Sequence, residues 1–79
     1  MHLSERERRA KLAKLAEIEG FESTDELLAD AVYDSVCPGI CTRLECDYTC
    51  EVEPDQDEGY CEDCQARTVQ SALMLAGLI

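Results

Sequence analysis

The chain has 79 residues, enough for one small domain at most, and domains of this size usually need disulfides, a metal or a partner for stability. Residues 1–16 hold five basic and two acidic side chains (+3), whereas residues 17–79 hold two basic and sixteen acidic ones (−14). Because so acidic a body repels nucleic-acid phosphates, the charge argues against a DNA- or RNA-binding protein.

The compartment follows from the two ends of the chain. The first residues are charged and lack the apolar core of a secretory signal. The most apolar stretch, residues 71–79, is much shorter than the about 20 residues that span a bilayer. We therefore expect a cytoplasmic protein with no membrane partner, in which thiols stay reduced and a cysteine cluster indicates a metal site.

Residues 3–19 contain no proline or glycine and are predicted to form a first helix, ending at Gly20 as its C-cap. Its apolar stripe is narrow, so we expect a solvated, loosely attached helix. The stripe consists of Leu12, Leu15, Ala16 and Ile18.

A second helix is predicted to begin at Ser23, which with Glu26 fits the capping box. Pro38 and Gly39 are expected to end it, because the residue before a proline avoids the α region. The two helices would form an N-terminal helical hairpin within residues 1–36. The apolar face of the second helix comprises Leu27, Leu28, Ala31, Val32 and Val36.

Residues 37–64 differ in kind, since they hold all six cysteines and both prolines. Residues 48–52 alternate like a short strand, residues 53–59 are an acidic, turn-rich loop, and Tyr60 would begin a return strand. This pattern predicts a short hairpin around a metal ion.

Residues 68–79 are predicted to form a C-terminal helix that packs against the second helix, with Gly77 as its C-cap. The expected fold is therefore a small metal-stabilised α+β domain. It joins residues 1–36 to a zinc-ribbon-like β-hairpin knuckle with a C-terminal helix, residues 37–79, in one compact unit. The apolar positions of the last helix are Val69, Ala72, Leu73 and Ala76.

The cysteine spacings indicate a zinc site. Zinc prefers four ligands in a tetrahedron, commonly two short-spaced cysteine pairs on tight turns. Cys61 and Cys64 form the clearest pair, and Cys41 with Cys46 leaves 14 residues before Cys61 for a strand and its return. We predict one structural Zn²⁺ bound by Cys41, Cys46, Cys61 and Cys64.

Alternatives to this set remain open. Cys37 with Cys41 and Cys46 with Cys50 are competing pairs, and a secreted protein would use the same residues in disulfides. If Cys37 and Cys50 are not ligands, we expect small, buried apolar side chains there.

The run Cys41-Thr-Arg-Leu-Glu-Cys46, the acidic segment 51–57 and Gly59-Tyr-Cys61-Glu-Asp-Cys64 resemble short zinc-ribbon-like proteins of bacteria and their phages. The similarity covers roughly residues 30–79. It implies zinc on the paired cysteines, which match Cys41, Cys46, Cys61 and Cys64, with Cys37 and Cys50 as extras. It implies no established activity.

Other sites have weaker support. Residues 53–59 resemble part of a calcium loop, but the glycine falls one position late and Cys64 stands where a glutamate belongs. A redox role for Cys61 and Cys64 would need a nearby cation, and acids adjoin them instead. The one histidine, His2, has no visible catalytic partner, and a four-thiolate zinc leaves no open position for water.

The sequence thus predicts a non-enzymatic zinc-binding protein that acts as a protein-interaction or regulatory module with a protein partner. The alternative is an acidic nucleic-acid mimic that occupies the DNA-binding groove of an enzyme. The basic first helix leaves direct DNA binding as a third, less favoured reading.

Overall fold

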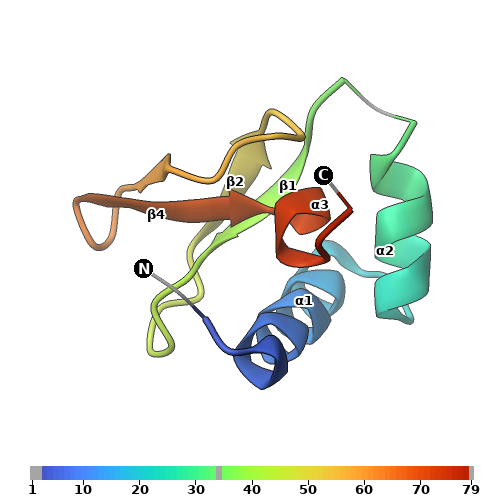
Figure 1. Cartoon of the computed structure of the whole chain (residues 1–79), viewed down its shortest axis with the longest axis horizontal. Coiled ribbons are helices and arrows are strands. Elements are labelled where there is room, and N and C mark those ends of the chain that lie inside the picture. Colours follow the sequence, from blue (N-terminus) through green and yellow to red (C-terminus); the bar gives the residue numbers. More distant parts are fainter. Residues whose placement is uncertain (1–2, 34, 79) are drawn as a thin grey trace.

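The computed structural model describes residues 3–33 and 35–78 and shows a small α+β fold, as predicted (Figure 1). Four antiparallel strands form one curled sheet in the order β2-β1-β4-β3. In residues 3–33 and 35–78, no helix is long and apolar enough to cross a bilayer. The elements are α1 (Glu5–Glu19), α2 (Thr24–Ala31), β1 (Cys37–Cys41), β2 (Thr49–Val52), β3 (Gly59–Cys61), β4 (Ala66–Ser71) and α3 (Ala72–Leu75).

Helix α1 is capped at both ends. The Ser4 side chain accepts a hydrogen bond from the Glu7 backbone N–H, and the Glu7 carboxylate accepts one from the Ser4 N–H, which completes a capping box. At the other end, Gly20 takes the left-handed conformation (φ 85°) that a C-cap requires, as predicted.

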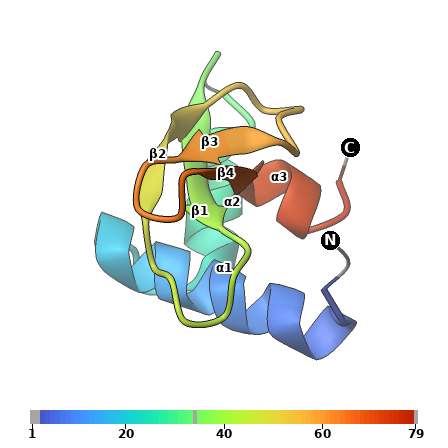
Figure 2. The ribbon, with the colours of Figure 1, turned by 90° about the vertical axis from the view of Figure 1, so that its left-hand side faces the viewer.

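The expectation that α1 is loosely attached was wrong. Leu12, Leu15 and Ala16 are buried in the main core together with Ile40 of β1 and Leu75 of α3. The narrow stripe is sufficient to attach α1 firmly, because the helix lies across the strands and contacts both other helices (Figure 2). Of the predicted stripe, only Ile18 is turned outward.

Helix α2 begins where predicted but is shorter. Ser23 caps it through the Glu26 N–H, whereas the Glu26 carboxylate accepts from the Glu22 N–H, so the predicted capping box is half formed. The helix ends at Ala31, and Val32 and Val36 are exposed instead of lying on a buried face.

The sequence reading missed β1, which contains the Pro38–Gly39 pair expected only to stop a helix. Pro38 is tolerated because pairing with β4 starts at Gly39, so Pro38 has only β2 beside it. Gly39 is needed for close packing, since a Cβ atom there would lie 2.8 Å from Val52 Cγ2 and 2.9 Å from the Gln70 carbonyl oxygen.

Strands β2 and β3 occur close to their predicted positions, but they do not pair with each other. They form opposite edges of the sheet, with β1 and β4 between them. The single expected hairpin is therefore wrong: β1 pairs with β2, and β3 pairs with β4. Each of these two hairpins carries one pair of the predicted zinc ligands at its turn.

The predicted C-terminal helix of residues 68–79 is only partly helical, because its first four residues belong to strand β4. Residues 66–71 form β4, and only Ala72–Leu75 are helical. Pairing with β1 on one side and β3 on the other outweighs the helical spacing of the apolar residues. The predicted contact with α2 is confirmed, since Leu73 packs against Ala31. Gly77 is left-handed (φ 75°) but follows the C-cap, which is Ala76. Ile79 lies outside the described residues.

The two ends of the sheet differ in structure. Helices α2 and α3 gather at the end of the sheet where β4 finishes, whereas the β1–β2 and β3–β4 turns lie at the opposite end (Figure 1). The main core draws on both predicted parts of the chain, from Leu15 and Leu27 to Ile40 and Ala72. The two turns therefore extend from a sheet that packs against the helices through this core.

Candidate metal centre

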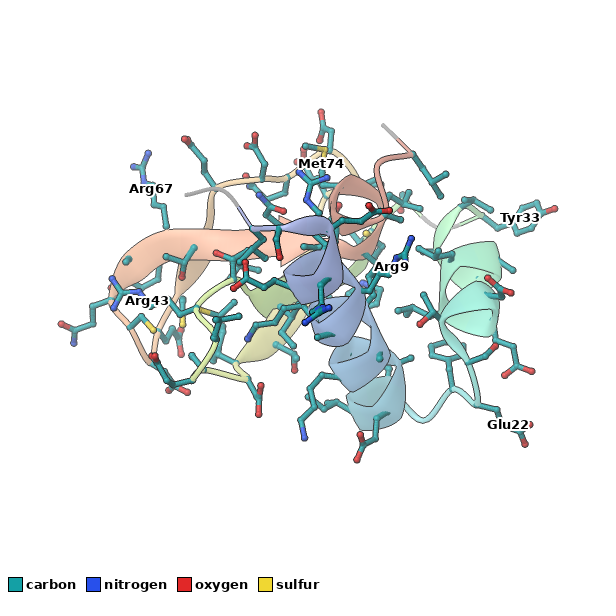
Figure 3. The ribbon with its side chains drawn as sticks, turned by 60° about the horizontal axis from the view of Figure 1, so that its bottom comes forward. Arg9, Glu22, Tyr33, Arg43, Arg67 and Met74 are labelled. Atoms are coloured by element: carbon teal, nitrogen blue, oxygen red, sulfur yellow. The ribbon has the colours of Figure 1, made fainter. Side chains whose placement is uncertain are left out.

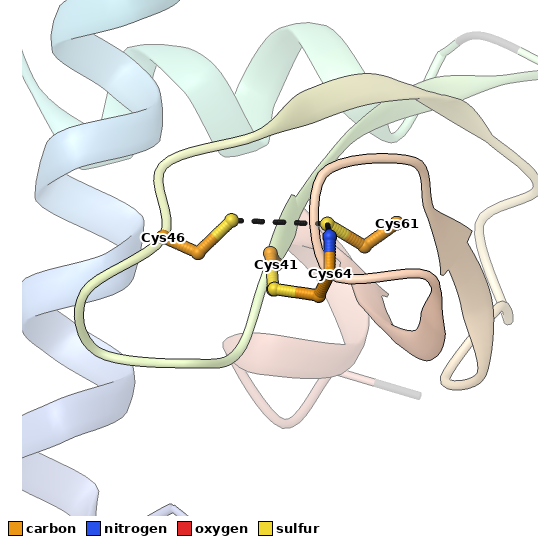
Figure 4. Close-up of side chains that lie close together, drawn as sticks. All are labelled: Cys41, Cys46, Cys61 and Cys64. Atoms are coloured by element: carbon orange, nitrogen blue, oxygen red, sulfur yellow. Dashed lines mark hydrogen bonds between the residues drawn. The ribbon is translucent and has the colours of Figure 1, made fainter.

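Two hairpin turns converge on one point beside the sheet. Cys41 ends β1 and Cys46 lies in the loop that follows, while Cys61 ends β3 and Cys64 lies in the turn before β4. Because β1 and β4 are neighbours, with Cys41 opposite Val69, the two turns face each other (Figure 4). The sheet register therefore brings the two cysteine pairs together.

Two of the sulfur–sulfur distances match the edge of a tetrahedral metal site. The Cys41 and Cys64 sulfurs are 3.8 Å apart, those of Cys46 and Cys61 are 3.7 Å apart, and all four lie within 4.8 Å of one another. Zinc–sulfur bonds of about 2.3 Å in a regular tetrahedron place sulfurs about 3.8 Å apart. All six cysteines are free thiols. The four predicted ligands can therefore hold a metal ion.

Backbone N–H groups point at these sulfurs, as thiolates require. The Cys64 N–H donates to the Cys61 sulfur at 3.3 Å. In the first turn, the backbone of Arg43 bonds Cys41 and that of Tyr48 bonds Cys46. Such bonds stabilise the charged form of each sulfur and help orient it.

The pKa values of Cys41, Cys46 and Cys64 reflect the crowding of the thiols. Burial tends to raise the pKa of Cys41, but hydrogen bonds from the Thr68 hydroxyl and the Arg43 backbone outweigh it, so this pKa is lowered. Burial and bonding to the other three thiols raise the pKa of Cys64 to about 12. The pKa of Cys46 is also raised: hydrogen bonds from the Tyr48 backbone and with Cys64 lower it, but burial and the bonds to Cys41 and Cys61 outweigh them. A cation among the sulfurs would favour all four thiolates.

The structure places the two remaining cysteines outside the group. Cys37 is buried between Ala31 and Leu73, on the far side from the turns, as a small apolar side chain would be. Cys50, on edge strand β2, is half-buried against the four-cysteine cluster, and burial raises its pKa. Neither belongs to the set of sulfurs within 4.8 Å.

The acidic loop of residues 53–59 does not gather its carboxylates. Within residues 3–33 and 35–78, the four cysteines are the one cluster of potential ligands compact enough for a metal ion. Glu53, Asp55, Asp57 and Glu58 are exposed, as in a solvated turn. His2 lies outside the described residues.

The sequence reading missed two polar residues that support the turns. The Thr68 hydroxyl, on β4, lies 3.0 Å from the Cys41 sulfur. The Lys11 ammonium, on α1, donates to the backbone carbonyls of Arg43 and Cys46. One signal for Lys11 was available, because it lies four residues before Leu15 and so on the stripe that becomes buried.

Comparison of the chain with protein-family models, with curated proteins and with solved structures finds no match. The centre must therefore be interpreted from its own chemistry. An ion bound by all four sulfurs would have a complete tetrahedron of protein ligands.

Proposed function

We propose that this protein binds one structural Zn²⁺ through Cys41, Cys46, Cys61 and Cys64. The observation that carries the proposal is the pair of sulfur–sulfur distances, 3.7 and 3.8 Å, which equal the edge of a zinc–thiolate tetrahedron. Four-sulfur tetrahedral sites are typical of zinc and of iron–sulfur centres, and one ion suits this compact group. Zinc binding would supply folding free energy to a small domain.

The proposed role is non-catalytic. A four-thiolate zinc has no open position at which water is activated or a carbonyl polarised. We place the protein in the cytoplasm, where six free thiols stay reduced. The zinc would then serve to fix the two turns and the sheet, and the activity would reside in the surface.

We propose that this surface binds a protein partner. Large apolar side chains project into solvent, among them Leu44 between the first ligand pair and Tyr60 on edge strand β3. Tyr33, at the end of α2, is 89% exposed and points away from the body of the molecule (Figure 3). Exposed aromatic side chains of this kind are enriched at interfaces.

The charge distribution supports a second candidate, a nucleic-acid mimic. Residues 51–63 contain seven acidic side chains and no basic one, and all seven are exposed. A surface of this sign can occupy a basic DNA-binding groove. The acidic residues are Glu51, Glu53, Asp55, Asp57, Glu58, Glu62 and Asp63.

Native mass spectrometry of protein purified under reducing conditions tests the metal. We expect one zinc per chain, lost on treatment with a chelator together with the native circular dichroism spectrum. Protein that is metal-free, folded and indifferent to chelators would contradict the proposal.

Salt dependence separates the two surface roles once a partner is captured. Mimicry predicts binding that weakens steeply with salt and is competed by DNA. An apolar interaction surface predicts binding that salt changes little. A gel-shift assay at low salt tests direct DNA binding, for which we expect no complex.

A further inference from the structure

Lys11 is the one charged side chain buried in the interior among residues 3–33 and 35–78. Only 4% of its side chain is exposed, although one face of helix α1 lies in solvent. Lysine is almost never this buried without partners, because an ammonium group loses its hydration there. The partners of Lys11 therefore indicate what the side chain is for.

All three partners of Lys11 belong to a single loop. Its Nζ atom lies 2.5 Å from the Arg43 carbonyl oxygen, 2.5 Å from the Cys46 carbonyl oxygen and 3.8 Å from Asp47 Oδ1. This loop starts directly after Cys41 and contains Cys46. These two residues are the first ligand pair of the proposed zinc site. The Lys11 ammonium, more than 30 residues away in sequence, thus bonds two backbone carbonyl oxygens of this loop.

The Lys11 contact adds to the hydrogen bonds that close the turn. Its own closing hydrogen bond runs from the Cys46 N–H to the Arg43 carbonyl oxygen at 3.1 Å, the same oxygen that Lys11 bonds. Without the ammonium, the Cys46 carbonyl oxygen would lose this hydrogen-bond donor in a part-buried position. A zinc ion with four thiolates also carries net negative charge, which a nearby cation stabilises.

We propose that Lys11 is a positioning residue of the metal centre. Its ammonium holds the Cys41–Cys46 turn so that both sulfurs face the ion, and it links zinc binding to the packing of α1. The inference rests on the proposed zinc binding. Outer-shell groups that orient ligands typically contribute about 10- to 100-fold to metal affinity.

Anchoring α1 to the sheet does not by itself need a lysine. Leu12, Leu15 and Ala16 already bury the helix against Ile40 and Leu75. If Lys11 only anchored the helix, Lys11→Met would lower stability through the unpaired Cys46 carbonyl without changing how the sulfurs meet the metal. The two explanations therefore predict different results for this one substitution.

The test compares zinc affinity in the full chain by competition with a chromophoric chelator. We expect Lys11→Met to weaken zinc binding about 10- to 100-fold. Lys14→Met, which removes the same charge from an exposed position one turn away, should leave the affinity unchanged. Equal affinities for the two variants would overturn the inference while leaving zinc binding intact.

Cobalt substitution adds a readout that a loss of general stability would not change. In Lys11→Met loaded with Co²⁺, we expect the d–d and thiolate-to-metal bands to shift, because the sulfurs are differently oriented. The Lys14→Met spectrum should coincide with that of the unsubstituted protein. Coincident spectra for all three proteins would argue against a positioning role. If the unsubstituted chain binds no zinc, the proposed function and this inference both fail.

A measurement on the unsubstituted chain decides the matter if Lys11→Met does not fold. Lys11 and Lys14 are the only two lysines in the sequence, so an amine-acetylating reagent can compare them directly. In the zinc-loaded protein, Lys11 should remain unmodified after Lys14 has reacted to completion. Equal modification of the two residues would show that the ammonium is not held by the turn and would overturn the inference.

Discussion

The Thr68 hydroxyl lies 3.0 Å from the sulfur of Cys41, and this contact joins the two hairpins at the centre of the cysteine cluster. Thr68 belongs to β4 and Cys41 to β1, the two central strands. The same residue accepts at its carbonyl oxygen from the Thr42 N–H at 2.7 Å, which fixes its place beside the turn. The bond to Cys41 favours the thiolate, the form that binds metal.

Thr68→Val keeps the shape and strand preference of the side chain but removes this hydrogen bond. A hydrogen bond to a charged group contributes about 1.5 kcal/mol, so we expect roughly tenfold weaker zinc binding in chelator competition. Thr49→Val on edge strand β2 serves as the control, with no change expected. Equal zinc affinities for Thr68→Val and the unsubstituted protein would show that the hydroxyl does not strengthen zinc binding by Cys41.

The four-cysteine set was predictable because it depends on short spacings. Cys61 and Cys64, and Cys41 and Cys46, are each close in sequence on one turn, and the β1–β4 register then brings the two turns together. The caps at Gly20 and Ser23 are local for the same reason. These features follow from a few neighbouring residues.

The strand order was not predictable in this way. Residues 69–76 carry a helical spacing of apolar side chains, yet residues 68–71 form part of a strand because β1 and β3 lie on both sides of β4. Likewise, Pro38 and Gly39 break a helix locally but fit a strand whose partners are far along the chain. Lys11 was missed because its acceptors lie more than 30 residues away.

Gly39→Ala tests the close packing of the central strand. The added methyl group would meet Val52 Cγ2 at 2.8 Å and the Gln70 carbonyl oxygen at 2.9 Å, and the backbone oxygen cannot simply rotate away. Overpacking of this kind costs about 1–3 kcal/mol. We expect that decrease in the free energy of unfolding, measured by denaturant titration of the metal-loaded protein.

Combining Gly39→Ala with Val52→Ala provides the control. It removes one of the two clashes, so the double variant should lose less stability than the two single losses added together. Simple additivity would indicate that Gly39 and Val52 are not in contact.

Cys37→Ala and Cys41→Ala make the same chemical change at two positions of β1. Cys37 packs against Ala31 and Leu73, so its replacement should cost about 1 kcal/mol of stability and leave one zinc per chain. Cys41→Ala should abolish zinc retention in native mass spectrometry, as should the same change at Cys46, Cys61 or Cys64. Loss of zinc from the Cys37 variant would place that residue among the ligands.

Zinc binding should release protons and tighten as pH rises. In the metal-free protein the pKa of Cys64 is about 12 and that of Cys46 is raised, so both thiols are protonated at pH 7. Metal must displace these protons, and lowering the pH strengthens the competition from protons. The apparent affinity should therefore fall from pH 8 to pH 6. Calorimetric titrations in two buffers with different ionisation enthalpies measure the protons released. An apparent affinity and enthalpy independent of buffer and pH would mean that the bound sulfurs were already thiolates, contrary to the crowding of the four thiols.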